Sequence, residues 1–173
     1  MGKKIMSGKE IDGIIKKSAG IIRKEIGLSD LVIIGIRRRG AVLADRLAEC
    51  FSGAEAPVGY LDINLYRDDF SKIGAHPVLS ETEVLFNIDD KKILLVDDVL
   101  FTGRTIRAAL DALVDLGRPA LVRLFVLVDR GHRELPISAD FVGMKAETRV
   151  NEMVEVRLKE IDGADEVSIE KRK

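Results

Sequence analysis

The sequence contains one cysteine and no tryptophan in 173 residues. A lone thiol, Cys50, excludes a disulfide framework and a cysteine-rich zinc site, and it fits the reducing conditions of a cytoplasm. Without tryptophan, and with only two tyrosines, Tyr60 and Tyr66, the chain has little aromatic surface on which single-stranded nucleic acid could stack. We therefore expect a cytoplasmic protein that is stabilised by an apolar core.

An excess of charge of one sign is also missing. Lys and Arg total 28 and Asp and Glu total 29, which leaves a formal net charge of −1. This balance predicts no chain-wide attraction to nucleic acid or to a membrane, so any basic site must be local. No apolar run is long enough to cross a bilayer, and the N-terminal segment lacks the apolar stretch of a signal peptide. The length fits one domain, which we expect to cover residues 1–173. We expect no membrane among the partners of the protein.

Apolar runs of strand length alternate with segments of helical spacing. Apolar residues recur every three to four positions between Ile11 and Ile26, and Ser7 with Glu10 predicts a capping box before them. From Met153 onward, strict alternation predicts an antiparallel strand with one solvent-exposed face. Buried strands are expected at 31–36, 57–65, 92–96, 121–128 and 141–143, and further helices follow the first and third of them. This alternation predicts an α/β fold, with a mainly parallel sheet flanked by helices on both faces.

Chemically distinctive side chains follow the strand predicted at 92–96. Ligands of such sheets bind beyond the carboxyl ends of the strands, where Asp97 and Asp98 stand side by side. The segment 102–105, Thr-Gly-Arg-Thr, then opens a helix whose free N–H groups favour a phosphate. Carboxylates accept hydrogen bonds from vicinal hydroxyls, so a ribose 5-phosphate satisfies both halves of the motif. The alternative is that these side chains only cap a turn and a helix, but a cap rarely needs two adjacent acids on an apolar strand.

The segment Ile93–Thr105 resembles the phosphoribosyl pyrophosphate signature of type I phosphoribosyltransferases. It has an apolar strand, an acidic pair, two apolar residues, one variable residue and Thr-Gly-x-Thr. Segments Asp111–Pro119 and Leu127–Pro136 are further similar to the branch that joins uracil phosphoribosyltransferase activity to attenuation of pyrimidine operons. The likeness covers nearly the whole chain. It implies a type I phosphoribosyltransferase fold with a core at about residues 28–143 and a small hood made by the N-terminal part and the C-terminal strand region.

The resemblance implies a reaction as well. A nitrogen of uracil would displace diphosphate from C1 of 5-phosphoribosyl 1-diphosphate (PRPP) and form UMP. The transition state has oxocarbenium character, so Arg38, Arg39 and Mg²⁺ would neutralise the leaving diphosphate, while Asp97 and Asp98 hold the ribose. Mg²⁺ would sit on substrate oxygens, and its direct protein ligands stay open. Relatives form dimers and larger assemblies, so a homodimer or higher homo-oligomer is expected.

Four stretches of this chain match the functional segments of the family. A non-proline cis peptide would lie at Arg38–Arg39 in the loop that contacts diphosphate. Each segment also has a plainer interpretation. The arginine triplet from Arg37 could be a solvated basic loop, and residues 66–69 could be an ordinary surface loop. His132 receives no acid or base role, and it could simply form a hydrogen bond at the surface. The implied catalytic residues are Asp97, Asp98 and Arg39; the PRPP and phosphate residues are Arg38, Arg39, Gly40, Asp97, Asp98, Val99, Leu100, Phe101, Thr102, Gly103, Arg104 and Thr105; the base or nucleotide residues are Val128, Asp129 and Arg130; and the flexible loop holds Tyr66, Arg67, Asp68 and Asp69.

The variable residue of the signature bears on the choice of base. Hypoxanthine-guanine enzymes that resemble this motif place an Asp there, near a purine ring nitrogen, whereas this chain has Phe101. An aromatic hydrocarbon ring cannot accept a proton. Uracil is therefore the expected base, and a purine phosphoribosyltransferase for hypoxanthine, xanthine or guanine is the enzymatic alternative.

The alternative to an enzyme is a regulatory RNA-binding protein. In such relatives a basic face binds pyrimidine leader mRNA in response to UMP, and catalysis can be minor. Part of that face would be kept by Lys16, Lys17, Arg133 and Thr148. Basic or polar contacts are missing where Gly20, Glu25, Ser138 and Met144 stand, and fewer phosphate contacts weaken RNA binding steeply. Uracil phosphoribosyltransfer is therefore the main prediction, with RNA attenuation beside it.

Overall fold

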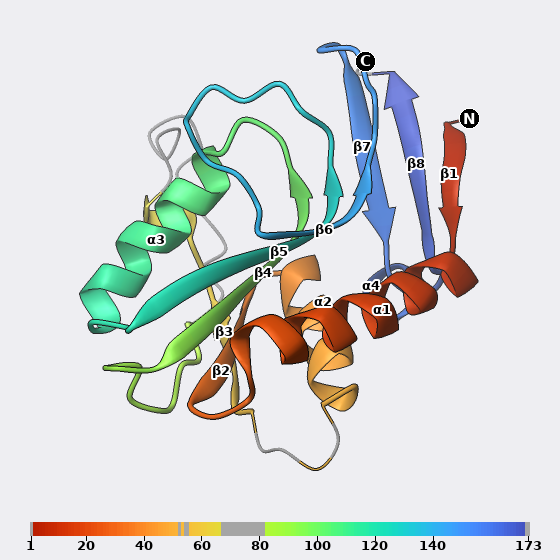
Figure 1. Cartoon of the computed structure of the whole chain (residues 1–173). Helices are drawn as coiled ribbons and strands as arrows, with labels where there is room; N and C mark the ends of the chain where they lie inside the picture. The colour runs from red at the N-terminus through yellow and green to blue at the C-terminus, as the bar shows by residue number, and fades with distance from the viewer. Residues whose placement is uncertain (1, 52, 54–55, 67–81, 172–173) are drawn as a thin grey trace.

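A five-stranded parallel sheet forms the centre of the computed structural model, which describes residues 2–51, 53, 56–66 and 82–171 (Figure 1). Its strand order is β3-β2-β4-β5-β6, and every neighbouring pair is parallel. The predicted α/β fold with a parallel sheet is therefore confirmed. The strands are β2 (Leu31–Ile36), β3 (Val58–Leu61), β4 (Lys92–Leu100), β5 (Leu121–Asp129) and β6 (Phe141–Lys145).

Helices cover both faces of this sheet. Helices α1 (Gly8–Ile26) and α2 (Arg39–Glu49) lie on one face, and α3 (Arg104–Leu116) lies on the other (Figure 1). Strand β2 shows why the strands read as continuous apolar runs: Leu31 and Ile33 pack into the cluster under α1 and α2, while Val32 and Ile34 pack into the cluster under α3. Because both faces are buried, alternation between polar and apolar residues disappears.

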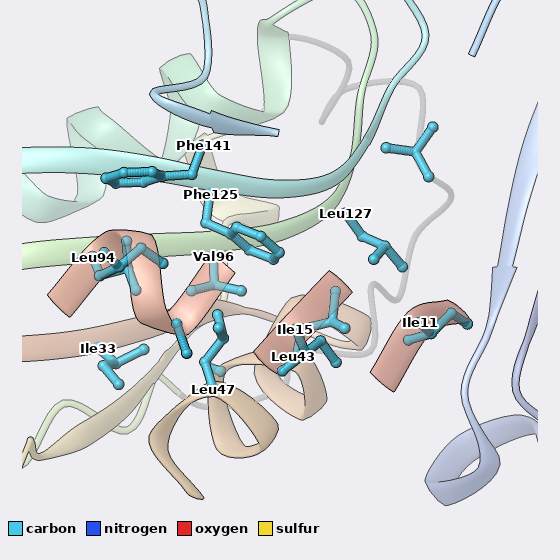
Figure 2. Packing of buried hydrophobic residues seen from close by; sticks show 14 of the residues in the cluster. Ile11, Ile15, Ile33, Leu43, Leu47, Leu94, Val96, Phe125, Leu127 and Phe141 are labelled. Carbon is cyan, nitrogen blue, oxygen red and sulfur yellow. The ribbon is translucent and has the colours of Figure 1, made fainter. Parts of the chain in front are cut away.

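The larger cluster joins the first two helices to the sheet. Side chains from α1 and α2 meet residues of β2, β4, β5 and β6, and Phe125 of β5 reaches to the middle of the group (Figure 2). The helical stripe predicted for α1 is confirmed, since Ile11, Ile15 and Ile22 are buried. The backbone N–H of Ser7 donates to Glu10 Oε2 at 2.7 Å, so the predicted capping box starts this helix.

Two of the predicted strands have boundaries that are wrong by four residues at their carboxyl ends, and the strands predicted at 121–128 and 141–143 continue to Asp129 and Lys145. The strand predicted at 57–65 ends at Leu61, because the backbone N–H of Asn64 donates to Asp62 Oδ1 at 2.9 Å and turns the chain into a 3-10 helix (Asn64–Tyr66). The strand predicted at 92–96 continues to Leu100, alongside β5. Backbone pairing does not require apolar side chains, so Asp97 and its neighbour lie inside the strand and not after it.

A second sheet stands at one end of the molecule (Figure 1). It is antiparallel, with the order β1-β8-β7, and a short helix, α4 (Lys159–Asp162), joins its last two strands. The alternation predicted from Met153 is confirmed, because Val154 and Val156 are buried while Met153 is exposed. The division into core and hood stays a prediction. The strands are β1 (Lys3–Ser7), β7 (Glu152–Arg157) and β8 (Glu166–Lys171).

A helix crosses a membrane only when it is long and apolar, and the helices of the described residues can be compared with that requirement. Within them, no helix combines the length and the apolar character needed to cross a membrane.

The packing of β5 predicts a large cost for truncating its central aromatic residue. Phe125 has no exposed surface, so Phe125→Ala should lower the free energy of unfolding by about 3–5 kcal/mol in urea denaturation. The matched control is Val114→Ala on α3, where the side chain is 75 % exposed and a change within about 0.5 kcal/mol is expected. A loss below about 1 kcal/mol for Phe125→Ala would show that this core does not depend on the ring.

Candidate active site

Two acidic side chains lie at the carboxyl end of the central strand β4. Asp97 is only 6 % exposed, and its Oδ1 accepts a hydrogen bond from the backbone N–H of Asp98 at 2.9 Å. Asp98 Oδ1 accepts from the backbone N–H of Val99 at 3.0 Å. Among the described residues, no Lys or Arg forms an ion pair with either carboxylate. The pair therefore keeps acceptor oxygens for a ligand.

The electrostatics of the pair follow from this burial. Removal from water raises the pKa of Asp97 well above its ordinary value, and the negative charge of Asp98 raises it further. Burial also raises the pKa of Asp98, although hydrogen bonds and the positive charge of Arg39 act against that rise. Both carboxylates are costly to ionise, and a ligand that offers hydroxyl donors or a cation would relieve that cost.

The turn predicted to bind a phosphate, residues 102–105, follows β4. Gly103 adopts a left-handed conformation with φ 93° and forms the N-cap of α3, so the turn predicted from the Thr-Gly-x-Thr motif is confirmed. The carbonyl of Thr102 accepts hydrogen bonds from the backbone N–H groups of Glu134 and Leu135 at 2.9 and 3.1 Å. These two hydrogen bonds hold the loop after β5 against the turn and stabilise it.

A glycine brings the arginine loop against the acidic pair. A Cβ atom on Gly40 would lie 2.5 Å from the carbonyl oxygen of Val96 and 3.2 Å from Cα of Asp97. Only a residue without a side chain permits this approach of α2 to β4. Gly40, predicted as a phosphate residue, has this packing role in the structure.

The three arginines of the loop point to different partners. Arg37 pairs with Glu83 at 2.7 Å and lies over the ring of Tyr60, with 5.3 Å from its Cζ to the ring centroid. Arg38 is exposed and leaves its guanidinium to solvent, whereas Arg39 pairs with Asp162 at 2.9 Å. The alternative interpretation, a solvated basic loop, therefore holds only for Arg38, the middle residue of the three.

The predicted position of the cis peptide bond is wrong by one residue. The bond lies between Arg37 and Arg38, not between Arg38 and Arg39. Strand β2 ends at Ile36 and α2 begins at Arg39, so Arg37 and Arg38 alone make the turn, and the cis bond joins these two.

The segment after β5 forms a second wall of the site. Asp129 receives two hydrogen bonds of 2.6 Å from Nη2 of Arg133, whose Nη1 donates to the carbonyl of Phe101 at 2.7 Å. Burial acts to raise the pKa of Asp129, but the hydrogen bonds from Arg133 and from the backbone of Gly131 outweigh it, so the pKa is lowered. Residues 129–133 and 145–148 line a cavity of about 470 Å³. Val128, which precedes Asp129 on β5, is buried.

An aromatic and a guanidinium stack where the two walls meet. The Cζ atom of Arg130 lies 4.0 Å from the centroid of the Phe101 ring, and Arg130 is only 5 % exposed. The edge of the same ring meets His132, with 6.1 Å between centroids. His132 Nε2 lies 2.6 Å from the carbonyl oxygen of Thr148, which can only accept a hydrogen bond. This contact agrees with a hydrogen-bonding role for His132.

The remaining predicted residues are spread around these walls. The hydroxyl of Tyr66 donates to Asp115 at 2.7 Å, while Arg67, Asp68 and Asp69 lie outside the described residues. Lys16 and Lys17 are exposed on α1, and Arg133 points inward to Asp129. The sequence alone does not reveal the partners Glu83 and Asp162, because no motif marks a residue that forms an ion pair with an arginine far away in the chain. Leu100 is buried, Arg104 pairs with Glu134 at 2.6 Å, and Thr105 opens α3 beside it.

The donor set was tested against the expected Mg²⁺. In the described part of the chain, no cluster of three or more His, Cys, Asp or Glu side chains could hold a metal ion. Mg²⁺ is commonly held by one or two carboxylates together with substrate phosphates and water. Asp97 and Asp98 fit that pattern, with the other ligands coming from substrate.

Comparisons with known proteins agree with this geometry. The family model for the phosphoribosyl transferase domain matches residues 3–160. A bifunctional protein PyrR of Deinococcus radiodurans is 52 % identical over 169 residues, which covers 95 % of this chain and 92 % of the relative. A bifunctional protein PyrR of Chloroflexus aurantiacus is 53 % identical over 171 residues, with coverage of 96 % and 94 %.

Solved structures show the same fold at low identity. A hypoxanthine phosphoribosyltransferase from Trypanosoma cruzi superposes with a TM-score of 0.75 at 22 % identity and covers 98 % of this chain and 96 % of the other. An enzyme with the same description from Staphylococcus aureus has a TM-score of 0.74 at 20 % identity, with 98 % and 92 % covered. Similarity at this level identifies the fold and leaves the base open.

The acidic pair predicts a pH-dependent gain in stability for Asp97→Asn. The unfolded chain ionises this carboxyl near its ordinary pKa of 3.8, whereas the folded protein resists ionisation because the pKa is raised. The stability that the protonated carboxyl contributes is therefore present at acidic pH and lost as the pH rises. Relative to the unaltered protein, the melting temperature of the Asn variant should rise little at pH 4 and more at pH 7.

The control for this experiment is Asp111→Asn on the exposed surface of α3, whose side chain is 52 % exposed. It should show no gain that grows with pH. A pH-independent difference for Asp97→Asn would contradict the raised pKa.

Proposed function

The chain belongs to the PyrR family of phosphoribosyltransferases, and from this premise we propose that it forms UMP and diphosphate from uracil and PRPP. One observation carries the proposal. Asp97 is a buried acid and Asp98 a half-buried one; neither has an ion-pair partner among the described residues, and both lie between the arginine loop and the N-terminus of α3. A ligand that joins vicinal hydroxyls to phosphates matches that arrangement.

The acidic pair would hold the ribose. Each carboxylate can accept a hydrogen bond from a ribose hydroxyl, and charge-assisted bonds of this kind are worth about 1.5–3 kcal/mol each. The 5-phosphate would lie at the start of α3, where the helix dipole is positive and the first backbone N–H groups have no earlier helical carbonyl to bind. Among them, the N–H of Arg104 donates to Thr102 Oγ1 at 3.3 Å, and a phosphate would have to compete with that hydroxyl. These contacts fix the sugar, and with it the position of C1.

The leaving diphosphate needs positive charge. The exposed guanidinium of Arg38 can swing to it, and Arg39 starts α2 directly beside the acidic pair. Guanidinium groups bind phosphate oxygens in a bidentate manner and stabilise charge that develops as the C1–O bond breaks. Asp97 and Asp98 would hold Mg²⁺, which when bound supplies further charge neutralisation on the diphosphate.

The cavity after β5 would take the base. Asp129 and Arg130 stand at its wall, and polar backbone groups of the loop can pair with the O4, N3–H and O2 edge of uracil. Phe101 offers a ring that neither donates nor accepts a proton, and Arg130 covers its face. A purine that requires an acid near its ring nitrogen would find none at this position. For that reason we propose uracil, with a purine base as the alternative.

An activity assay tests this proposal. The protein should convert uracil and PRPP to UMP in the presence of Mg²⁺, and turnover of hypoxanthine, xanthine and guanine should be lower. The double variant Asp97→Asn, Asp98→Asn should lose about 100-fold or more in kcat/KM, because two charge-assisted contacts disappear. Asp111→Asn serves as the control carboxylate and should retain full activity. Full activity in the double variant would remove these acids from the mechanism, and faster turnover of hypoxanthine would assign a purine enzyme.

We further propose UMP-dependent binding of pyrimidine leader mRNA, which the word bifunctional in the names of the relatives favours. Lys16 and Lys17 are exposed on α1 and can contact phosphates. Thr148 and Arg133 line the cavity after β5, although Arg133 already donates a hydrogen bond to Asp129. A cytoplasmic location and a homodimer or larger assembly belong to the same proposal.

A gel shift tests the RNA part. UMP should strengthen binding of the leader RNA, and Lys16→Ala with Lys17→Ala should weaken it by about tenfold and flatten its salt dependence. Lys91→Ala is the control, since Lys91 pairs with Asp30 before the start of β4, away from the site. If UMP stimulates no shift at moderate salt, only the enzyme remains.

A further inference from the structure

Arg39 forms a two-pronged contact with a residue far along the chain. Its Nε donates to Asp162 Oδ2 at 3.3 Å, and its Nη2 donates to Asp162 Oδ1 at 2.9 Å. Arg39 is the first residue of α2, whereas Asp162 is the last residue of α4, 123 positions later. The contact therefore joins the arginine loop of the proposed active site to the helix that connects two strands of the second sheet.

The carboxylate of Asp162 is itself held in place. Its Oδ2 accepts a hydrogen bond from the backbone N–H of Leu158 at 2.9 Å, and Gly163 ends the short helix directly after it in a left-handed conformation. The hydrogen bond from Leu158 and the charge of Arg39 lower the pKa of Asp162, so it stays ionised at neutral pH. The arginine therefore meets a fixed negative charge.

The backbone at Arg39 lies beside the acidic pair. The next residue, Gly40, packs against β4, where a Cβ atom on it would lie 2.5 Å from the carbonyl oxygen of Val96 and 3.2 Å from Cα of Asp97. The backbone of Arg39 is thus fixed by packing, and the direction of its side chain is set by Asp162.

The contact is not needed simply to attach α4 to α2. Arg46, two turns further along α2, donates to Glu160 at 3.0 and 2.6 Å and to Asp165 at 2.7 Å. That second ion-pair group already connects the same elements. The pair at Arg39 differs from it by its position beside Asp98.

We propose that Asp162 is a positioning residue, which holds the guanidinium of Arg39 in the direction needed to receive the diphosphate of PRPP. The inference rests on the proposed function and extends it, because it makes α4, the connection between β7 and β8, part of the diphosphate site. A long arginine side chain loses conformational freedom when it binds an anion, and a partner that orients it beforehand reduces that loss. Asp162 acts through Arg39 and touches no substrate.

Steady-state kinetics of Asp162→Asn tests the proposal. The variant should raise the KM for PRPP about tenfold, while kcat and the KM for uracil stay within about twofold. Glu160→Gln is the matched control: it breaks the Arg46 contact between the same two elements and should leave all three constants within about twofold. Asp162→Glu, which keeps the charge on a longer side chain, should recover part of the affinity for PRPP.

A double-mutant cycle identifies the route of the effect. If Asp162 acts only through Arg39, then Arg39→Ala with Asp162→Asn binds PRPP no more weakly than Arg39→Ala alone. Fully multiplicative effects, equal effects of Asp162→Asn and Glu160→Gln, or an unchanged or lower KM for PRPP in Asp162→Asn would each overturn the proposal.

Calorimetric titration with PRPP separates this inference from the proposed function. An unaltered protein that neither binds PRPP nor forms product refutes both. Turnover of uracil with no effect of Asp162→Asn refutes the positioning role alone. Thermal unfolding of every variant accompanies the kinetics, and if Asp162→Asn does not fold, the titration of Asp162→Glu against Glu160→Gln decides the question.

Discussion

The withdrawal from water of two neighbouring carboxylates, one buried and one half-buried, is the constraint on which the rest of this structure depends. Asp97 and Asp98 lie in the central strand of the parallel sheet, and the removal of their side chains from water raises both pKa values. Such a placement costs free energy unless hydrogen bonds and packing compensate. The strands on either side of β4 and the two apolar clusters supply that compensation, so the stability of the core is what maintains the acids in position.

The loops around the pair are held by contacts that leave its oxygens accessible. Gly40 permits α2 to approach β4 at Val96, and Arg133 fastens the loop after β5 to the carbonyl of Phe101. Asp162 orients Arg39 from α4, the helix that joins two strands of the second sheet. Each wall of the site therefore comes from a different part of the chain, and each is fixed by a contact that does not use the carboxylate oxygens of the two acids. This separation lets a ligand compensate the carboxylates without disturbing the scaffold.

The elements with strong local patterns were predicted well. The strand at 31–36, the stripe of α1 and the glycine turn at Gly103 depend on residues that are close together in sequence. The extension of β4 through Asp97 was missed, because polarity was used as the signal for a strand end while the backbone pairs with β5 regardless of side-chain type. The length of β3 was wrong for a related reason, since the side chain of Asp62 ends the strand by a local hydrogen bond.

By itself, the sequence determined the α/β architecture, the acidic pair and the turn that follows it, because those features are written in short-range patterns. Tertiary structure alone decided the partners of the arginines. The three arginines are the same residue type and adjacent in sequence, yet their surroundings differ. Arg37 pairs with Glu83, Arg38 is exposed to solvent and Arg39 pairs with Asp162. Such differences arise from contacts between segments far apart in sequence, and the energy of a charged side chain depends on which of those segments folding places beside it.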